Sequence, residues 1–256
     1  MNFWLKQFIG ITILATAVAC SNSQATAPQV VSADVVICLD GSTSFPGPIL
    51  GRARLAIADL IESKFLKLGG TGATIWTYWI TTNTPNSPID EPWQIPMIDN
   101  EPTRPDLSDP KWTYDSEGLA EVITEYQAKK AAINKQLADA RMSAEPHLTR
   151  LREASSPQAE GSDVLGCLQK AGDVTDHGYV LAATDAQLYG SQNVSKLQLD
   201  HISRIAFLFH YCATSQECAD SKQHMLDTLN GTRGDQDTHP DITFYDVDRP
   251  IDHVLN

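Results

Sequence analysis

The chain is poor in basic residues. Its 19 Lys and Arg stand against 32 Asp and Glu, which gives a formal net charge of −13. The sequence contains no basic patch and no interleaving of basic with aromatic side chains, so we do not expect a nucleic-acid partner. The acidic excess favours solubility outside the cytoplasm and attraction for cations, but it does not indicate a fold.

The sequence also lacks the short motifs of several common enzyme classes. No G-x-S-x-G elbow, H-E-x-x-H helix or Walker A loop occurs in it. It has no visible internal repeat, and its heptads are not sustained enough for a coiled coil. These absences argue against an enzyme that uses any of those motifs.

The one apolar run near the N-terminus is too short to span a membrane comfortably. Lys6 supplies a positive charge, and residues 8–18 are almost wholly apolar. Small residues follow at Ala17-Val18-Ala19, as at the cleavage site of a signal peptide. We therefore expect residues 1–19 to be a signal peptide and residues 20–33 to be a short polar tether.

Cys20 comes directly after the expected cleavage site and resembles the lipidated cysteine of bacterial lipoproteins. Ala17 stands where such sequences usually have Leu, so plain cleavage after Ala19 stays open as the alternative. The resemblance implies an exported protein held on a membrane of the bacterial cell envelope through an N-terminal lipid. The alternative is a soluble periplasmic or secreted protein.

Residues 34–256 alternate strand-like and helix-like segments. The first, residues 34–39, is a continuous apolar run, which is typical of a parallel strand buried on both faces. We expect a three-layer αβα sandwich, with a doubly wound and mostly parallel sheet. Further strands are expected at 73–81, 179–183, 202–211 and 242–247, and helices between Pro46 and Gly69, at 164–171 and at 215–230.

Residues 83–157 interrupt this rhythm and are expected to form an insertion. Its first part holds seven prolines up to Pro110, with residues 93–98 as a candidate edge strand. From Ser116 to about Ala154 an amphipathic pattern predicts a helix, which we expect Pro146 to divide in two. Two hypotheses stay open: a wall or lid beside a binding site, or a stabilising decoration.

The end of the first strand carries the chemistry. Asp40, Ser42 and Ser44 form the pattern D-x-S-x-S immediately after the buried run. One carboxylate and two hydroxyls make an oxygen-only cluster, which suits Mg²⁺, Mn²⁺ or Ca²⁺ better than zinc. In open α/β sheets, ligands bind where strands end at the carboxyl edge.

Two further segments complete a resemblance to the metal-ion-dependent adhesion site (MIDAS) of von Willebrand factor A (vWA) domains. Ser162, in Gly161-Ser162-Asp163-Val164-Leu165, occupies the position of the family's usual Thr. Asp185 ends a strand in Thr184-Asp185-Ala186, where vWA domains usually have T-D-G. The resemblance implies that Asp40, Ser42, Ser44, Ser162 and Asp185 hold a divalent cation, Mg²⁺ first, directly or through water.

The same resemblance implies a binding module and not an enzyme. In the family, a partner protein's acidic side chain completes the metal's coordination. One alternative is a structural vWA-like domain that does not use its metal, given the changes at Ser162 and Ala186. A metal-dependent phosphohydrolase is less expected, because Ser42 stands where a dehalogenase-like phosphatase needs a second acid.

An exported context makes the cysteines candidates for disulfides. Cys212 and Cys218 lie six positions apart, so we favour a bond between them. The pairing of Cys38 and Cys167 stays open, because it requires their two elements to pack side by side. With His210 and His224, the Cys212 region superficially resembles a zinc site, but we favour the disulfide.

Overall fold

The computed structural model describes residues 33–188, 196–232 and 239–255. The expected signal peptide, Cys20 and nearly all of the expected tether lie outside the described residues. Within these residues, no helix combines the length and the apolar character needed to cross a membrane.

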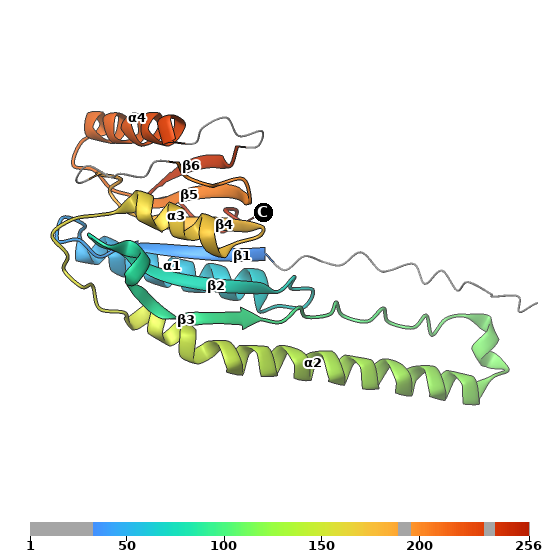
Figure 1. Cartoon of the computed structure of the whole chain (residues 1–256). Helices are drawn as coiled ribbons and strands as arrows, with labels where there is room; N and C mark the ends of the chain where they lie inside the picture. The colour runs from blue at the N-terminus through green and yellow to red at the C-terminus, as the bar shows by residue number, and fades with distance from the viewer. Residues whose placement is uncertain (1–32, 189–195, 233–238, 256) are drawn as a thin grey trace, which may run out of the picture. The chain divides into compact units, whose positions relative to one another are not determined.

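One six-stranded sheet forms the centre of the fold (Figure 1). Its strand order is β3-β2-β1-β4-β5-β6, and only β3 runs antiparallel to its neighbour. The order reverses beside β1, which is the topological switch point of a doubly wound sheet. The strands are β1 (Ala33–Asp40), β2 (Ala73–Ile80), β3 (Pro88–Ile95), β4 (Gly178–Ala183), β5 (Ile202–His210) and β6 (Asp241–Asp246).

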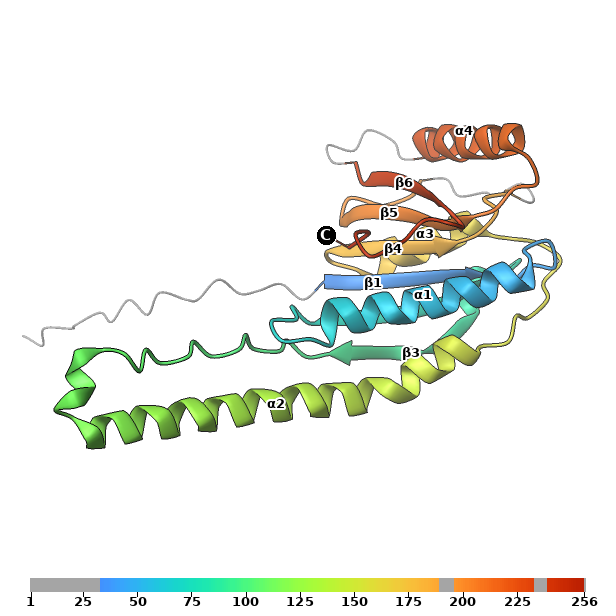
Figure 2. The same ribbon diagram turned by 180° about the vertical axis from the view of Figure 1, so that it is seen from behind.

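Helices cover both faces of this sheet, as Figures 1 and 2 show from opposite sides. Alternate residues of β1 point to opposite faces: Val35 and Ile37 pack in one apolar cluster, Val36 and Cys38 in the other. The predicted α/β sandwich is therefore correct. α1 (Gly47–Phe65) and α2 (Ser116–Glu153) cover the first face, and α3 (Val164–Val174) and α4 (Ser215–Thr232) the second.

The edge strand β3 is longer than the sequence indicated and begins earlier. It pairs with β2 from Pro88 to Ile95, whereas residues 93–98 were expected. Pro88 and Pro92 are tolerated because an outer strand has one side without ladder partners. The first part of the 83–157 segment therefore belongs to the sheet.

The expected division of the long helix at Pro146 is wrong, because α2 runs unbroken from Ser116 to Glu153. Proline removes the N–H that would bond the carbonyl of Met142, at a cost of about 3 kcal/mol. Met142 is exposed, so water can bond that carbonyl. Ala144 and Leu148 are buried on either side of Pro146, and their packing keeps both turns helical.

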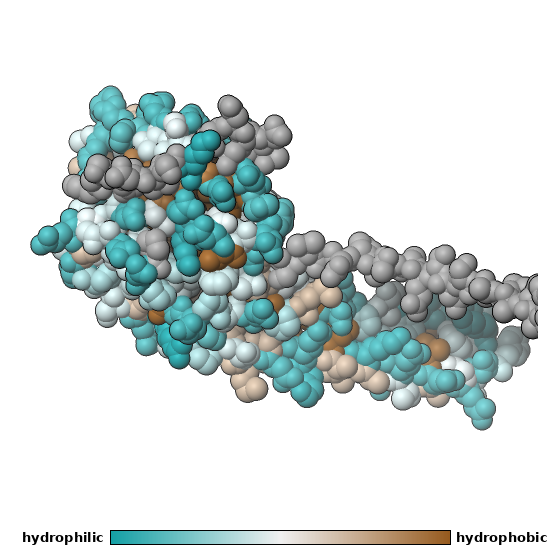
Figure 3. All heavy atoms as spheres, viewed as in Figure 1, coloured by the Kyte–Doolittle hydropathy of each residue, from teal (hydrophilic) through white to brown (hydrophobic). Residues whose placement is uncertain are grey.

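Only the C-terminal half of α2 packs on the sandwich. Arg141 bonds the carbonyl of Leu66, just beyond the end of α1, through its Nε (3.2 Å) and Nη2 (3.1 Å). Arg54, near the middle of α1, donates to the carbonyl of Ala154, the residue that follows α2. The N-terminal half of α2 extends past the end of α1 (Figure 2), with hydrophobic residues scattered among hydrophilic ones (Figure 3).

Candidate metal centre

Three loops bring the five predicted metal ligands together at the carboxyl edge of the sheet. Asp40, Ser42 and Ser44 come from the loop after β1, Ser162 precedes α3, and Asp185 follows β4. Ser44 Oγ lies 3.3 Å from Asp185 Oδ2, and Ser162 Oγ lies 3.1 Å from Asp40 Oδ1. These bonds join positions more than a hundred residues apart in the sequence.

Asp40 is the fully buried centre of this cluster. Its Oδ1 accepts the backbone N–H of Ser42 at 2.9 Å, and both oxygens accept from Ser162 Oγ. Thr184 Oγ1 donates to Asp40 Oδ2 at 2.7 Å, a role that the sequence analysis missed. The sequence signal for this role was the position of Thr184 directly after β4, the strand that pairs with β1.

The cluster opens to solvent on the side of Ser44. Ser42 is buried and Ser44 is exposed, and their Oγ atoms lie 3.0 Å apart. Ser162 and Asp185 are both buried, at 2% and 4% exposure. A cation held among these oxygens would therefore be covered by protein on the inner side and accessible beside Ser44.

The two carboxylates carry uncompensated charge. Burial, together with the negative charge of Asp40, raises the pKa of Asp185 to about 6, despite hydrogen bonds from Gln187 N and Ser44 Oγ. In the part of the chain that the structure describes, neither Asp40 nor Asp185 forms an ion pair. A dication fits this donor set, because it supplies the missing positive charge to two carboxylates and three hydroxyls.

The Ser162 loop is held in place by the loop that follows β2. Asp163 N donates to the carbonyl of Thr81 at 2.7 Å, and Thr84 Oγ1 donates to the carbonyl of Asp163 at 2.7 Å. The side chain of Asp163 also caps α3 by accepting the N–H of Gly166 at 2.8 Å. The position of Ser162 is therefore fixed through hydrogen bonds to the residue that follows it, Asp163.

The segment just after α2 buttresses the loop after β1. Ser156 Oγ and Ala159 N both donate to the carbonyl of Gly41, at 3.1 and 2.8 Å. Thr43 N in turn donates to the carbonyl of Ala159 at 3.0 Å. A Cβ at position 41 would lie 2.6 Å from Pro157 Cγ, so this close approach requires glycine.

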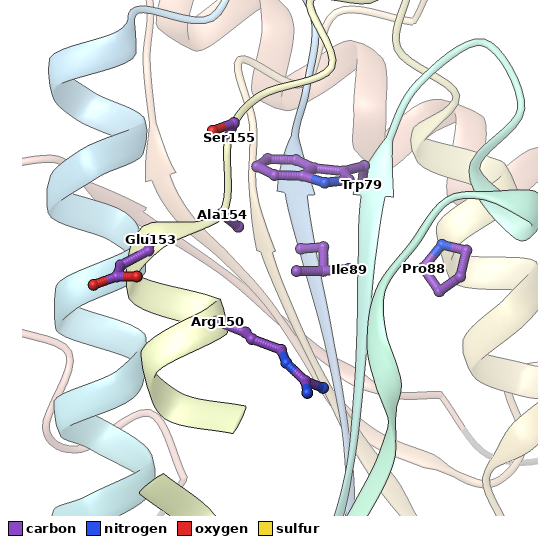
Figure 4. A pocket seen from close by; sticks show the side chains of 7 residues that line it. All are labelled: Trp79, Pro88, Ile89, Arg150, Glu153, Ala154 and Ser155. Carbon is purple, nitrogen blue, oxygen red and sulfur yellow. The ribbon is translucent and has the colours of Figure 1, made fainter. Parts of the chain in front are cut away.

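This buttress is the part of the 83–157 segment that reaches the metal edge. The N-terminal half of α2 lies beyond the end of α1 that is opposite the metal edge, so the wall-or-lid hypothesis does not hold for that half. A pocket of about 330 Å³ lies beside the buttress, with Arg150 extending between α2 and β3 (Figure 4). It is lined by Trp79, Pro88, Ile89, Arg150, Glu153, Ala154 and Ser155, and by none of the five predicted ligands.

Left-handed backbone gathers at this same edge. Among the described residues other than glycine, positive φ occurs at Gln158 (56°), Ala186 (57°) and Phe209 (53°). They lie in the buttress, after β4 and near the end of β5. Ala186 is the position where vWA domains usually have Gly, so the departure falls where glycine would relieve the backbone.

Two disulfides lie near the edge. Cys38 bonds Cys167 with a Cα–Cα distance of 6.4 Å, which settles the pairing that the sequence left open. This buried bond joins β1, two residues before Asp40, to α3, five residues after Ser162. The structure also forms the bond between Cys212 and Cys218 that the sequence favoured.

A scan against protein-family models finds no match for this chain, and a search of curated proteins finds none either. Among solved structures, two of proximal thread matrix protein 1 from the mussel byssus are similar, one of them with a zinc-occupied MIDAS motif. Their TM-scores are 0.45 and 0.39, at 8% and 6% sequence identity. The matches cover 84% and 78% of this chain but only 43% and 47% of those chains.

Proposed function

We propose that this chain is a metal-dependent protein-binding module of the cell envelope, in adhesion or assembly. In this proposal a divalent cation is held by Asp40, Ser42, Ser44, Ser162 and Asp185. The observation that carries it is the pair of buried carboxylates, Asp40 and Asp185, with no counter-charge among the described residues. Buried charges are costly unless they are paired or bind a metal, so this arrangement favours a cation.

The donor set favours a hard cation. All five side chains offer oxygen, which suits Mg²⁺ first, with Mn²⁺ and Ca²⁺ as alternatives. Five side-chain oxygens leave the octahedral shell of the ion incomplete, and three of them are weak neutral hydroxyl ligands, so the bound metal could still take an anionic ligand. The chain's own residues would hold the ion, and the exposed side near Ser44 would admit a partner's carboxylate.

The expected partner is a protein with an acidic side chain. We further propose that Cys20 is lipidated, so that the chain meets the membrane only through this N-terminal anchor. Retention of partners from native membranes on the immobilised chain, released by a chelator, tests the first idea. An Asp185→Asn chain that retains the same proteins through chelator washing would contradict it.

Thermal unfolding tests metal binding itself. Addition of Mg²⁺ or Mn²⁺ to chelator-treated protein should raise the melting temperature. At a metal concentration one hundred times Kd, the free energy of unfolding should rise by about 2.7 kcal/mol. Asp40→Ala and Ser42→Ala should lose this response, since both remove a proposed ligand. Thr43→Ala is the matched control, because its exposed side chain lies in the same loop outside the ligand set, and it should respond normally.

A structural domain without functional metal is the second candidate. One observation favours it: Asp40 already accepts hydrogen bonds from Ser42, Ser162 and Thr184, so its oxygens are satisfied without an ion. Melting curves that do not respond to metal in any variant would decide for this candidate. We propose no catalytic role, and Mn²⁺-dependent hydrolysis of a phosphoester such as p-nitrophenyl phosphate would overturn that view.

A further inference from the structure

A second cluster of metal-binding side chains lies where β5 leads into α4. One ligand atom each from His210, Cys212 and Cys218 fits within 4.8 Å of the others. The two sulfurs form a disulfide in this structure. We propose that reduction of this disulfide creates a zinc site made of His210 Nδ1 and the thiolates of Cys212 and Cys218. This inference is independent of the proposed function of the first site.

The hydrogen-bond network indicates which nitrogen of His210 is available. Ser221 Oγ donates its single hydrogen to the carbonyl of Asp185 at 2.9 Å. It can therefore only accept from His210 Nε2, which lies 3.1 Å away and must carry the ring proton. Nδ1 is then left with a free lone pair, and it lies 3.9 Å from Cys212 Sγ.

The imidazole is also neutral and held in place. His210 is 2% exposed, and burial lowers its pKa to about 4, with the charge of Lys222 acting in the same direction. Neutral imidazole is the form that binds metals. Its edge-to-face contact with Phe244, at 5.5 Å between ring centres, and its bond to Ser221 fix the ring, as a second shell does in metal sites.

Reduction needs little movement to bring both sulfurs to one ion. The Cα atoms of Cys212 and Cys218 lie 5.3 Å apart, so side-chain rotation suffices to place each sulfur about 2.3 Å from a shared zinc. Two thiolates and an imidazole are a donor set typical of Zn²⁺, unlike the oxygen-only set at Asp40. Three protein ligands leave a fourth position for water or another donor.

The reductant that we assume is a dithiol. It transfers two electrons and two protons to the Cys212–Cys218 bond, forms its own cyclic disulfide and leaves two thiols. Zinc then displaces both thiol protons. Cys212 and Cys218 are partly exposed, whereas Cys38 and Cys167 are fully buried, so a dithiol reaches the first pair before the second.

Cobalt absorption tests the site on the full chain with Cys20→Ser as background. After mild dithiol treatment, alkylation and mass spectrometry should label Cys212 and Cys218 but not Cys38 or Cys167. Co²⁺ should then give a thiolate-to-metal charge-transfer band at one equivalent, which Zn²⁺ abolishes. Asp40→Ala should keep the band, because the first site offers only oxygen, and this separates the two proposals.

Variants identify the ligands and the support. Cys212→Ser should lose the band, and Ser221→Ala, which frees the ring of His210, should weaken zinc binding about tenfold or more. His224→Ala is the matched control, an exposed histidine of α4 outside the cluster, and should change nothing. A reduced chain without a charge-transfer band would overturn the proposal. So would a band and affinity that are unchanged in both His210→Gln and Ser221→Ala.

Discussion

Two carboxylates of this protein with little exposed side-chain surface, Asp90 and Asp185, have opposite electrostatic surroundings. Asp90 on β3 meets His147 Nδ1 at 2.5 Å and the guanidinium of Arg150, both on α2. Burial alone would raise the pKa of Asp90, but these two partners outweigh it and hold the pKa below its usual value. Asp185 has Asp40 as its charged neighbour and no ion pair among the described residues, and its pKa is raised to about 6.

The difference separates a structural contact from a site that requires a ligand. At the β3–α2 contact the chain supplies its own cation, Arg150, and Trp93 stacks on His147 with ring centres 4.9 Å apart. At the metal edge the chain supplies hydroxyls and acids, and leaves the positive charge to come from elsewhere. The first contact is complete as it stands, and the second gains from a cation.

The largest expected effect comes from the buried disulfide behind the metal edge. Replacement of both Cys38 and Cys167 by Ala should cost about 4 kcal/mol of unfolding free energy, because the bond closes a long loop. It should also lower Mn²⁺ affinity, since the bond ties the strand of Asp40 to the helix after Ser162. Urea unfolding and Mn²⁺ titration measure both effects.

The matched control removes the Cys212–Cys218 bond instead, whose sequence separation is only six. Its loss should cost about 2 kcal/mol, because the entropy of closing a shorter loop is smaller. Equal losses for the two double variants would contradict the assignment of the larger constraint to β1 and α3.

Matched amide substitutions at Asp90 and Asp185 test whether the two carboxylates differ in their effect on stability. Asp90→Asn should lose about 1 kcal/mol at pH 7, because Arg150, whose side chain is 57% exposed, loses its ion pair but keeps its contact with water. Asp185→Asn should gain about 1 kcal/mol without metal, because it removes an uncompensated charge beside Asp40. Urea unfolding in chelator measures both, and two changes of the same sign would show that the carboxylates do not differ as described.

The contribution of Asp90 to the free energy of unfolding should depend on pH, because its pKa is lowered in the folded protein. Its folded pKa lies below the unfolded value of 3.8, so its contribution is present above pH 3.8 and is lost as pH falls through the folded pKa. The stability difference between wild type and Asp90→Asn should therefore shrink toward zero in strong acid. Unfolding curves at several pH values between 7 and 2 measure it, and a constant difference would argue against ion pairing.

The smallest expected effect is at Ala186. Ala186→Gly should relieve about 1 kcal/mol of strain from the left-handed backbone. It also removes a buried methyl group and raises the conformational entropy of the unfolded chain, and these two losses of stability together are of similar size. We expect a net change within about 0.5 kcal/mol by chemical denaturation. Ala186→Val should lose more than that, since a β-branched residue tolerates this backbone poorly. A Val variant as stable as the wild type would contradict the strained backbone.

Much of the fold and of the candidate site could be predicted, because both depend on local pattern and parallel geometry. The apolar run of β1 marks a buried central strand, and the carboxyl ends of parallel strands must meet at one edge. That rule brings Asp40 and Asp185 together without any knowledge of packing. The hydroxyl of Ser162 follows from its place before α3.

The parts that could not be predicted depend on tertiary packing. Pro146 stays helical because Ala144 and Leu148 are buried around it, which helix propensity alone does not reveal. The Cys38–Cys167 pairing requires α3 to lie against β1 at one register. Likewise, the bond from Thr184 to Asp40 depends on side-chain orientation across two strands.

Direct Mn²⁺ binding tests the central claim that the metal edge, unlike the β3–α2 contact, lacks a cation of its own. Electron paramagnetic resonance of free Mn²⁺, titrated with chelator-treated protein, counts the bound ions. We expect one tightly bound Mn²⁺ per chain for the wild type and for Asp90→Asn, and none for Asp185→Asn. A wild type that binds no Mn²⁺, or an Asp185→Asn chain that binds it equally well, would contradict the account.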